Sequence, residues 1–374
     1  MSDVCRWPDQ GCPPNMVDAP LASAFEPQSG PVPNADFAAL SPTVLERSAQ
    51  AVWMKCWLSA YAPQGAICVE GVHFLEHIHS LNAISLRVLH SPTNLQTPRH
   101  SIVAEASLGS PEIRHALRRH RAAGVILEYL PHPDMETIRT TLQSAGLRHL
   151  VIAQAAIPVT VCTHTFDHFV ELRSKRERQR TRKLLRLVDD ADGSLCFSVI
   201  TDGAQVAPLI EECLALEQAS WKGREGTAIL DKPEDARFYR QLAQDLAAAG
   251  LLRLALLHDR AGQLVAFELC MAWDGRLIAL KTSCSERHLD LSPGHVLALL
   301  HIRHCCADPT ISLYDVTGNG LSPAPHLLRY ADRQELLWRV ILFAPGWRGR
   351  ILQLMWQARL RLRSVKRFVA SRCG

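Results

Sequence analysis

The sequence has few of the features that mark membrane-spanning, secreted or metal-binding proteins. Its 374 residues contain no apolar run of about 18 residues, which argues against a transmembrane helix. The N-terminal stretch MSDVCRWPDQGCPPN has no apolar core of the kind that a signal peptide needs. The 12 cysteines form no Cys-x-x-Cys pair, so we expect free thiols in a reducing compartment. These absences predict a cytoplasmic protein.

Charge and histidine content weigh against two further classes. The formal net charge of +4 is too small to indicate a nucleic-acid partner by itself. The one histidine cluster, HFLEHIH, contains His73, His77 and His79 but has no cysteine-rich or carboxylate-rich partner segment, so we expect no metal. With 47% hydrophobic and 21% charged residues, the composition is that of a soluble globular protein with a substantial core.

The chain divides into segments of different composition. Residues 1–40 carry seven prolines and no apolar period, which predicts a disordered leader. From Ser41 onward helical and strand-like patterns alternate, beginning with a helix that Ser41 can cap and that has Pro42 at its first position. This alternation predicts an α/β layer. Helices are expected at 41–62, 111–124 and 133–146, and strands at 83–89, 101–107, 124–130 and 147–154.

A basic stretch opens the second half of the chain. Eight basic residues lie between Arg173 and Arg186, against one acidic residue, Glu177. A nucleic-acid surface and a solvated helix face would both explain this pattern. No aromatic residue or glycine interleaves with the charges, as on a base-stacking surface, which favours a solvated face with Leu172 and Leu184 packing inward.

The order of elements in residues 195–343 predicts one mixed sheet. Asp274-Gly275 between two apolar runs indicates a hairpin. The strands at 276–284 and 310–316 should be parallel and joined by a right-handed crossover through a helix, and 310–316 should form a last pair with 333–343. Strands are expected at 195–201, 251–259, 264–273, 276–284, 310–316 and 333–343, and helices at 203–220, 233–250 and 295–308.

Six fragments, in this order and spacing, resemble a known family. They are ASWKGREGTAI, FYRQLAQDLAAAGLLRLALL, LVAFELC, LKTSC, LSPG and YDVTG. Together they resemble the GNAT-superfamily acetyltransferases of the cellulose-biosynthesis CelD/BcsL type, which are relatives of the Fem-type peptidoglycan aminoacyl-transferases. The resemblance implies an α/β fold of two tandem GNAT-like units, with a mixed sheet flanked by helices. The units are a degenerate one at 41–165 and an acetyltransferase domain at 166–345, followed by a basic helical tail at 346–374.

The resemblance also implies a reaction. An acyl group, expected to be acetyl, would pass from coenzyme A to an amine or hydroxyl of a sugar or a cell-surface polysaccharide precursor. Two alternatives stay open: aminoacyl transfer of the Fem type, and a non-catalytic scaffold in a polysaccharide biosynthesis or export complex. The chain departs from the family in one place. Family members commonly carry a Tyr-Lys pair after the glycine that matches Gly318, where this chain has Pro325-His326.

The junction between the strand at 276–284 and the following helix is the expected donor site. A helix N-terminus presents unpaired N–H groups and partial positive charge, and so attracts phosphate. The resemblance implies that the backbone of Ser292, Pro293, Gly294 and His295 holds the coenzyme A pyrophosphate. A plain helix start, capped by Ser292 and with Pro293 at its first position, would produce the same pattern.

Three carboxylates are candidate bases for removing the acceptor proton. Glu217 closes a helix, Glu268 interrupts an apolar strand, and Asp315 ends a strand before a glycine-rich turn. Each also has a structural interpretation. Glu217 would be a surface charge, Glu268 a partner of Lys281 across the hairpin, and Asp315 a turn residue.

The stretch LEQASWKGREGTAIL is the expected wall of the acceptor site. Trp221 would offer a flat apolar face to a sugar ring or acyl chain, and Lys222 and Lys281 would offer cations to an anionic group. Gly223 and Gly226 would let the loop bend. The alternative is a tight loop with Trp221 buried in the core.

The C-terminal tail is basic and amphipathic. Residues 345–374 contain eight Arg or Lys residues and no acidic residue. Such a helix suits either a peripheral contact with the inner membrane or packing on the domain. The apolar stripe comprises Ile351, Met355, Ala358, Leu362, Val365 and Val369.

Overall fold

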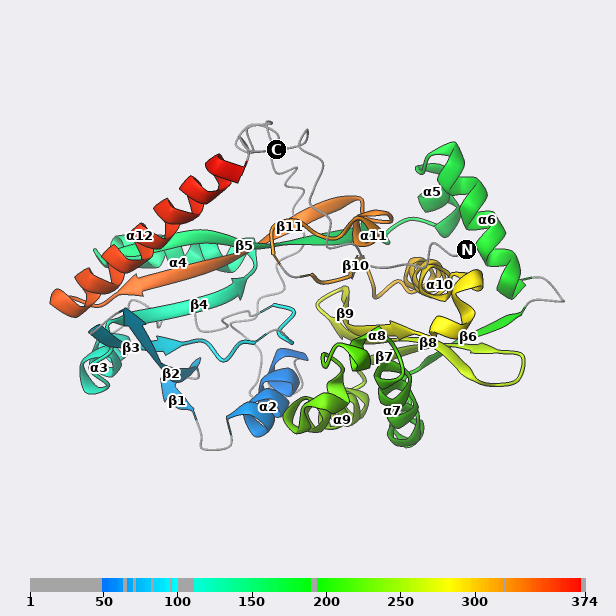
Figure 1. The fold of residues 1–374 in the computed structure, drawn as a ribbon, viewed down its shortest axis with the longest axis horizontal. Coiled ribbons are helices and arrows are strands. Elements are labelled where there is room, and N and C mark those ends of the chain that lie inside the picture. Colours follow the sequence, from blue (N-terminus) through cyan, green and yellow to red (C-terminus); the bar gives the residue numbers. More distant parts are fainter. Residues whose placement is uncertain are drawn as a thin grey trace.

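The computed structural model of the chain describes residues 49–62, 66–69, 72–81, 84–94, 96–99, 111–189, 194–318 and 320–370. The predicted leader, the first residues of the predicted helix at 41–62 and the predicted strand at 101–107 lie outside these ranges. Figure 1 shows an elongated molecule with strands along its whole length and helices on both sides of them.

One mixed sheet of eleven strands forms the centre of the described structure. Its order is β1-β2-β3-β4-β11-β5-β10-β9-β8-β7-β6, so strands from the first half of the chain gather at one end and strands from the second half at the other. The strands are β1 (Ile67–Val69), β2 (Val72–Leu81), β3 (Ile84–His90), β4 (Gly124–Leu130), β5 (His149–Val161), β6 (Leu195–Ile200), β7 (Leu252–Asp259), β8 (Leu264–Trp273), β9 (Arg276–Cys284), β10 (Leu313–Asp315) and β11 (Arg333–Phe343).

The pairings predicted for β8, β9 and β10 are confirmed. β8 and β9 are antiparallel, and the hairpin residues Asp274 and Gly275 have φ values of 49° and 68°, as a type I′ turn requires. β10 pairs parallel with β9, and α10 (Pro293–Ala307) connects the two strands. The predicted α/β fold, a mixed sheet flanked by helices, is therefore present.

The last strand lies elsewhere than the sequence indicates. Strands β10 and β11 are expected as neighbours, but β11 lies between β4 and β5, and β5 separates it from β10. β5 has 13 residues, enough to pair with β11 along most of its length and with β10 at its end. The C-terminal strand thus completes the first half of the sheet, a long-range pairing that local periodicity does not encode.

Helices cover both faces of the second half of the sheet. α7 (Gly203–Gln218) and α9 (Pro233–Ala248) pack on one face. α10 packs on the other face, together with α5 (Phe166–Glu171) and α6 (Lys175–Asp189). Most side chains between each helix layer and the sheet are apolar and almost fully buried, and Glu217, Glu268 and His301 are polar exceptions.

α2 (Ala49–Tyr61) comes early in the chain but packs against the second half (Figure 1). Trp53 and Trp57 are buried, and the Trp53 ring meets Phe238 of α9 edge-on with centroids 6.0 Å apart. Tyr61 donates a 2.5 Å hydrogen bond to a carboxylate oxygen of Asp235 on α9. The apolar face of this predicted helix therefore joins the first segment to the core of the second half.

α3 (Pro111–Arg119) and α4 (His132–Ser144) cover one face of the first half. The opposite face is covered by α12 (Trp347–Ala370), which buries Leu352 and Trp356. Gly349 permits this packing, because a Cβ at this position would lie 1.9 Å from the Ala344 carbonyl oxygen.

The apolar stripe predicted for the tail is only partly right. Ile351 and Met355 pack against the sheet, but Ala358 and Leu362 are exposed. Among the described side chains of α12, those of residues 351–356 make the contact with the sheet. None of the helices in the described ranges is both long and apolar enough to span a membrane.

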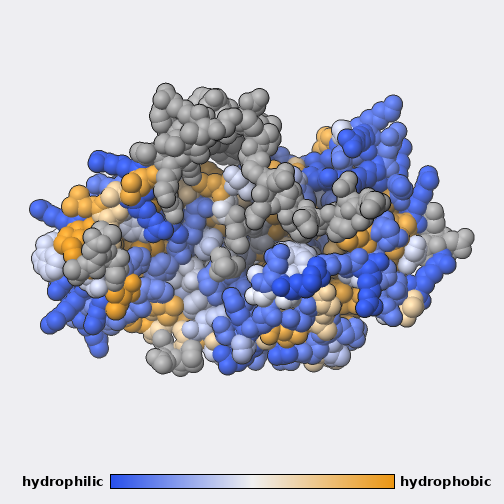
Figure 2. Space-filling model, in the orientation of Figure 1, coloured by the Kyte–Doolittle hydropathy of each residue, from blue (hydrophilic) through white to orange (hydrophobic). Residues whose placement is uncertain are grey.

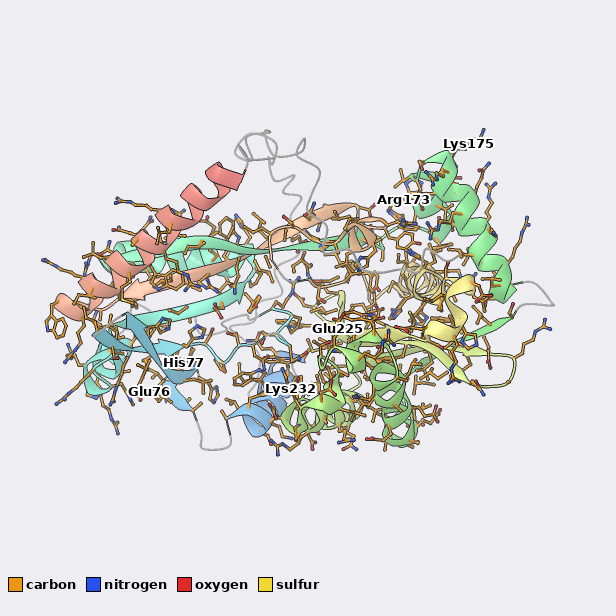
Figure 3. The ribbon with its side chains drawn as sticks, in the orientation of Figure 1. Glu76, His77, Arg173, Lys175, Glu225 and Lys232 are labelled. Atoms are coloured by element: carbon orange, nitrogen blue, oxygen red, sulfur yellow. The ribbon has the colours of Figure 1, made fainter. Side chains whose placement is uncertain are left out.

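The basic stretch forms α6, whose outer face is exposed. Leu184 is buried as predicted, but Leu172 is 59% exposed, because it lies at the C-terminal cap of α5 and not inside a helix. Lys175 begins α6 at the edge of the molecule, well away from the sheet (Figure 3).

Candidate functional site

β9 and β10 diverge near the centre of the sheet. Their parallel pairing ends at Ile278 and Asp315, while β9 continues to Cys284 paired only with β8 among the described strands. A β-bulge at Leu280 interrupts the ladder between β8 and β9. Beyond Ile278, the edge of β9 that faces β10 therefore has no described strand to bond. The Thr282 carbonyl accepts from Lys222, and the other peptide groups of this edge are left for a ligand.

A pocket of about 190 Å³ lies where these strands part. Lys281 is its one charged lining residue. The lining comprises Gln96, Thr97, Pro98, Leu280, Lys281, Thr317 and Gly318. Thr317 has a φ of 54°, a strained value for a β-branched residue, and such strain is common at functional sites.

Sequence reasoning missed one wall of this pocket. Residues 96–98 come from a loop of the first half that crosses to the second half. Gln96 accepts a 2.8 Å hydrogen bond from the Tyr239 hydroxyl and donates one of 3.2 Å to Asp235, which fixes the loop on α9. The loop has no motif or periodicity, so no sequence signal marks it.

Glu217 lies behind Lys281 and is completely buried. Its Oε1 accepts from Lys222 Nζ at 3.0 Å and lies 3.1 Å from Lys281 Nζ, and its Oε2 accepts from the Ile229 N–H at 2.9 Å. Burial lowers the pKa of Lys222. The negative charge of Glu217 opposes this shift, and the positive charge of Lys281 adds to it. The interpretation of Glu217 as a surface charge is wrong. Two ammonium groups share its carboxylate.

The stretch after α7 forms a short helix, α8 (Trp221–Arg224), beside the end of β9. Lys222 Nζ donates a 2.6 Å hydrogen bond to the Thr282 carbonyl of β9. Trp221 is half-buried, so the alternative in which its side chain is buried in the core is wrong. The structure brings Lys281 to the pocket lining, whereas Trp221 and Lys222 do not line the pocket. Lys222 is connected to Lys281 through Glu217.

Two glycines shape this stretch in different ways. A Cβ at Gly223 would lie 2.0 Å from the Gln218 carbonyl oxygen, so close backbone approach requires a glycine there. Gly226 has a φ of 66°, which a glycine adopts without strain. Both let the chain turn back toward α9.

Asp315 ends β10 and is 1% exposed. One carboxylate oxygen forms an ion pair with Arg99, and the other accepts from the Thr317 N–H at 2.9 Å. These are the contacts of an anchored turn residue, and the carboxylate does not line the pocket. Because Arg99 follows the 96–98 wall and Thr317 belongs to the opposite wall, the ion pair holds the two walls together.

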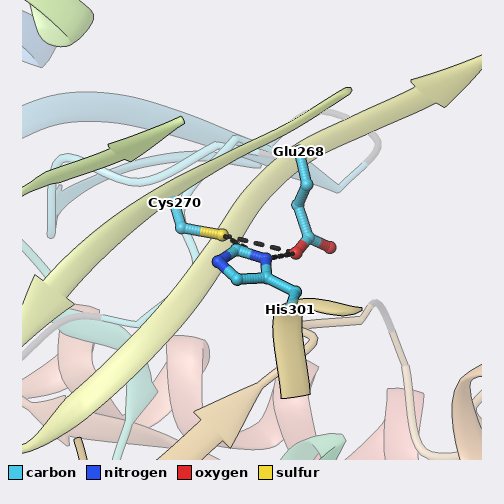
Figure 4. Close-up of side chains that lie close together, drawn as sticks. All are labelled: Glu268, Cys270 and His301. Atoms are coloured by element: carbon cyan, nitrogen blue, oxygen red, sulfur yellow. Dashed lines mark hydrogen bonds and ion pairs between the residues drawn. The ribbon is translucent and has the colours of Figure 1, made fainter. Parts of the chain in front are cut away.

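Glu268 is enclosed between β8, β10 and α10 (Figure 4). The Tyr314 hydroxyl donates to its two carboxylate oxygens at 2.8 and 2.7 Å, and His301 Nδ1 lies 2.5 Å from Oε2. Burial raises the pKa of Tyr314, and the Glu268 charge raises it further. Enclosed in this way, Glu268 does not reach the pocket.

The expected pairing of Glu268 with Lys281 is wrong. Thr282 stands opposite Glu268 in the ladder, and Lys281 stands opposite Leu269. Lys281 therefore points to the other face of the sheet, where it meets Glu217.

Glu268, Cys270 and His301 are a group in the described residues whose donor atoms lie close enough to hold one metal ion. A tetrahedral zinc ion would keep nitrogen and oxygen ligands about 3.3 Å apart. The 2.5 Å between His301 and Glu268 is instead a hydrogen-bond distance. The three side chains would have to separate to bind an ion, so the cluster fits a buried hydrogen-bond network better than a metal site.

The predicted histidine cluster lies on β2, far along the sheet from the pocket (Figure 3). His77 stands 5.0 Å from His90 of β3, measured between ring centroids. Burial lowers the pKa of His73, His77 and His79. No group of three possible metal ligands in the described residues includes them.

The start of α10 lies beside the end of β9. Pro293 occupies the first helical position, as predicted. Ser292 has a φ of 51° and its side chain makes no capping bond, so the predicted cap is wrong. Gly294 is exposed, and a Cβ there would meet only Cys284 Sγ, at 3.9 Å. The helix start is therefore open to a ligand.

Basic groups surround this helix start. His295 Nδ1 lies 3.3 Å from the Tyr330 hydroxyl. Burial lowers the pKa of His295 to about 4, and the nearby charges of Arg180, Arg329 and His326 contribute. His295 is therefore neutral at physiological pH, and the two arginines give the site a positive potential that favours an anion.

Comparison with known proteins agrees with this geometry. Residues 175–323 match the family described as acetyltransferase (GNAT) domain. No curated protein matches the chain. Among solved structures, FemX covers 80% of this chain and 92% of its own at 10% identity, with a TM-score of 0.50.

Two further solved structures are similar over comparable lengths. A conserved protein of unknown function from Bacteroides thetaiotaomicron shares 13% identity over 80% of this chain and 90% of its own, with a TM-score of 0.49. The C-terminal domain of a putative lysylphosphatidylglycerol synthetase from Agrobacterium fabrum shares 12% identity over 82% and 90%, with a TM-score of 0.48. The family match covers residues 175–323, the part of the chain in which β9 and β10 separate at the pocket, and this part of the chain is similar to acetyltransferase (GNAT) domains.

Proposed function

We propose that this chain transfers an acyl group from an acyl-CoA to an amine or hydroxyl at the pocket between β9 and β10. The observation that carries the proposal is the parting of these parallel strands at Ile278, with a bulge at Leu280 and an open helix start at the end of β9. A long thioester can lie along the free edge of β9, its phosphates at α10 and its acyl group in the pocket.

The donor would be held mainly by backbone groups. Gly294 is exposed at the α10 start, and the field of Arg180 and Arg329 favours the negative charge of a pyrophosphate. Pro293 has no N–H to donate, and the N–H groups of Ser292 and His295 already donate to the carbonyls of Leu289 and Ser292 at 3.0 and 2.9 Å. The phosphates would therefore depend on the Gly294 N–H, on the helix dipole and on the two arginines. Acetyl-CoA is the simplest donor of this class.

The chemical step needs little from side chains. The acceptor nitrogen or oxygen attacks the thioester carbonyl carbon, the carbon–sulfur bond breaks, and the coenzyme A thiolate leaves and takes up a proton. Free peptide N–H groups of β9 beyond Ile278 can stabilise the developing oxyanion. Holding the two reactants in line supplies most of the remaining acceleration.

Among the three carboxylates, Glu217 is connected to the pocket. It contacts Lys281, which lines the pocket. Lys281 could pass one proton to Glu217 and then, as a neutral amine, take the proton of the acceptor, or a water molecule could carry that proton to Glu217. Asp315 acts as a positioning residue through Arg99, and Glu268 supports the core beneath the site. Lys281 can bind an anionic group of the acceptor, with Lys222 behind it and Trp221 at the rim.

The acceptor is a sugar or a cell-surface polysaccharide precursor, as resemblance to the CelD/BcsL type implies. One structural observation favours a second candidate. The fold is shared with FemX over most of both chains, so an aminoacyl donor of the Fem type also suits this architecture. A non-catalytic scaffold would have the same fold but bind no donor.

Isothermal titration with acetyl-CoA tests the proposal. Gly294→Val should abolish binding by blocking the phosphates, and Gly294→Ala should weaken it at least tenfold. Ser292→Ala should keep most of it. Gly203→Ala is a matched control, because its Cβ would meet Ala247 at an ordinary 3.7 Å in another helix.

Thermal stability separates donor loss from misfolding. At 100 times its dissociation constant, acetyl-CoA should stabilise the wild type by about 2.7 kcal/mol. Gly294→Val should melt like the ligand-free wild type, and Gly294→Ala, if it binds tenfold more weakly, should be stabilised by about 1.4 kcal/mol. Wild-type protein that binds no acyl-CoA would overturn the catalytic proposal and leave the scaffold.

A further inference from the structure

The outward side of α12 has features that acyl transfer does not use. The helix packs on the sheet through Leu352 and Trp356, which are 5% exposed or less. Trp347 is 61% exposed, and Leu354 and Leu362 are each 63% exposed. They are three of the four most exposed large apolar side chains in the described ranges.

These exposed side chains share one side of the helix. At about 100° per residue, Leu354 lies roughly 20° from Trp347 around the axis, and Leu362 lies about 60° from Trp347 on the other side. The buried Leu352 and Trp356 lie roughly 140° and 180° from Trp347. The helix therefore has two apolar sides, of which the sheet covers one.

Charge on the exposed side has a single sign. α12 contains no Asp or Glu, and Arg350 and Arg361 are exposed and lie roughly 60° and 40° from Trp347, on the same side as Leu354. Arg148, just before β5, donates a 2.6 Å hydrogen bond to the Gln353 side chain and adds to this positive field. In Figure 2, hydrophobic and hydrophilic surface mix along the upper left edge, where α12 runs in Figure 1.

We propose that this side of α12, defined by Trp347, Leu354, Leu362, Arg350 and Arg361, binds an anionic membrane surface. Apolar side chains would enter the boundary between headgroups and acyl chains, with the indole at the headgroup level, and arginines would meet lipid phosphates. A second copy of the chain fits less well, because a twofold contact would place this basic side against itself.

Vesicle co-sedimentation with the full chain tests the proposal. Vesicles of phosphatidylcholine alone are compared with vesicles containing about 30 mol% phosphatidylglycerol, at low and high salt. Wild type should pellet with the anionic vesicles and be released by salt. The double variant Leu354→Gln/Leu362→Gln should lower the partition coefficient at least tenfold, and Arg350→Gln/Arg361→Gln about 20-fold.

A matched control comes from the opposite end of the molecule. Leu172 of α5 is 59% exposed, and Leu172→Gln should leave vesicle binding unchanged. Lipids brominated along the acyl chain should quench wild-type tryptophan fluorescence, and Trp347→Phe should remove that quenching. Far-ultraviolet circular dichroism confirms that each variant is folded.

Each other outcome overturns the proposal. Equal binding to neutral and anionic vesicles would show that this side of α12 does not recognise anionic lipid. Absence of binding to both would show that it does not bind membranes. A concentration-dependent dimer that Leu354→Gln/Leu362→Gln abolishes would assign the face to a second copy. Vesicle binding that occurs only after deletion of residues 1–40 would indicate that this segment, and not a membrane, occupies this side of α12 in the full chain.

Discussion

The buried ion pair between Arg99 and Asp315 gives the sharpest test of how the pocket is built. It joins a loop of the first half to the end of β10, and both residues are buried. Arg99→Met would leave the Asp315 carboxylate buried without its cation, a change that typically costs about 3 to 5 kcal/mol. Asp315→Asn keeps an acceptor for the Thr317 N–H, so we expect a smaller loss of about 2 kcal/mol.

The double variant Arg99→Met/Asp315→Asn should lose far less unfolding free energy than the two single variants lose in sum. It removes both charges, and the Arg99 Nε has no hydrogen-bond partner in the described structure, so the pair is incompletely compensated even in the wild type. We expect a total loss of about 1 to 2 kcal/mol and thus a coupling of at least about 3 kcal/mol. Urea denaturation of the four proteins measures the cycle.

Turnover, followed as coenzyme A release, shows whether Asp315 positions the turn or acts as the base. If Asp315 positions the turn through Arg99, both single variants should lower turnover, Asp315→Asn by about 10²-fold, and the double variant should add little. If Asp315 is the base, Arg99→Met should spare turnover while Asp315→Asn loses it. Additive stability losses would refute the coupling of the two walls. Full turnover in Asp315→Asn would refute any role in catalysis.

Three single positions give further tests. Gly223→Ala should lower the free energy of unfolding by about 3 kcal/mol or more, because its Cβ would lie 2.0 Å from the Gln218 carbonyl oxygen, and urea denaturation showing wild-type stability would contradict that contact. His295 has its pKa lowered from 6.5 to about 4 on folding, so its contribution to stability is complete above pH 6.5 and is lost as pH falls toward 4. Melting temperatures across that range should fall less steeply for His295→Asn, and identical slopes would argue against the shift. Glu268→Gln should cost about 1 to 3 kcal/mol by disturbing the His301 contact and change turnover only a few-fold, whereas a 10²-fold loss at unchanged stability would identify Glu268 as the base.

Local chemistry made the second half of the sheet predictable. Asp274-Gly275 fixes a type I′ turn whatever the rest of the chain does, and this sets the register of β8 and β9. Pro293 marks the helix start after β9 in the same way. A strand, a helix and a further strand then leave a parallel pairing as the natural arrangement.

The partners of the charged residues were not predictable, because they come from remote parts of the chain. Arg99 and Asp315 are 216 positions apart, and no local pattern relates them. The bulge at Leu280 sends Lys281 to Glu217 and not to Glu268, and a bulge leaves no clear mark in an alternating strand. The candidate residues were therefore found by type, but their roles depend on contacts that only the fold supplies.

The pocket is a product of both halves of the chain, although the matched family region covers only residues 175–323. The 96–98 loop supplies one wall, Tyr239 holds that loop by its hydrogen bond to Gln96, and α2 braces α9 from the outside. β5, also from the first half, closes the free edge of β10. Without these contacts the gap between β9 and β10 would have one wall, and Asp315 would be a buried charge without a cation. The first half therefore supplies one wall of the site and the cation that pairs with Asp315, while Lys281 of the second half supplies the charge that lines it.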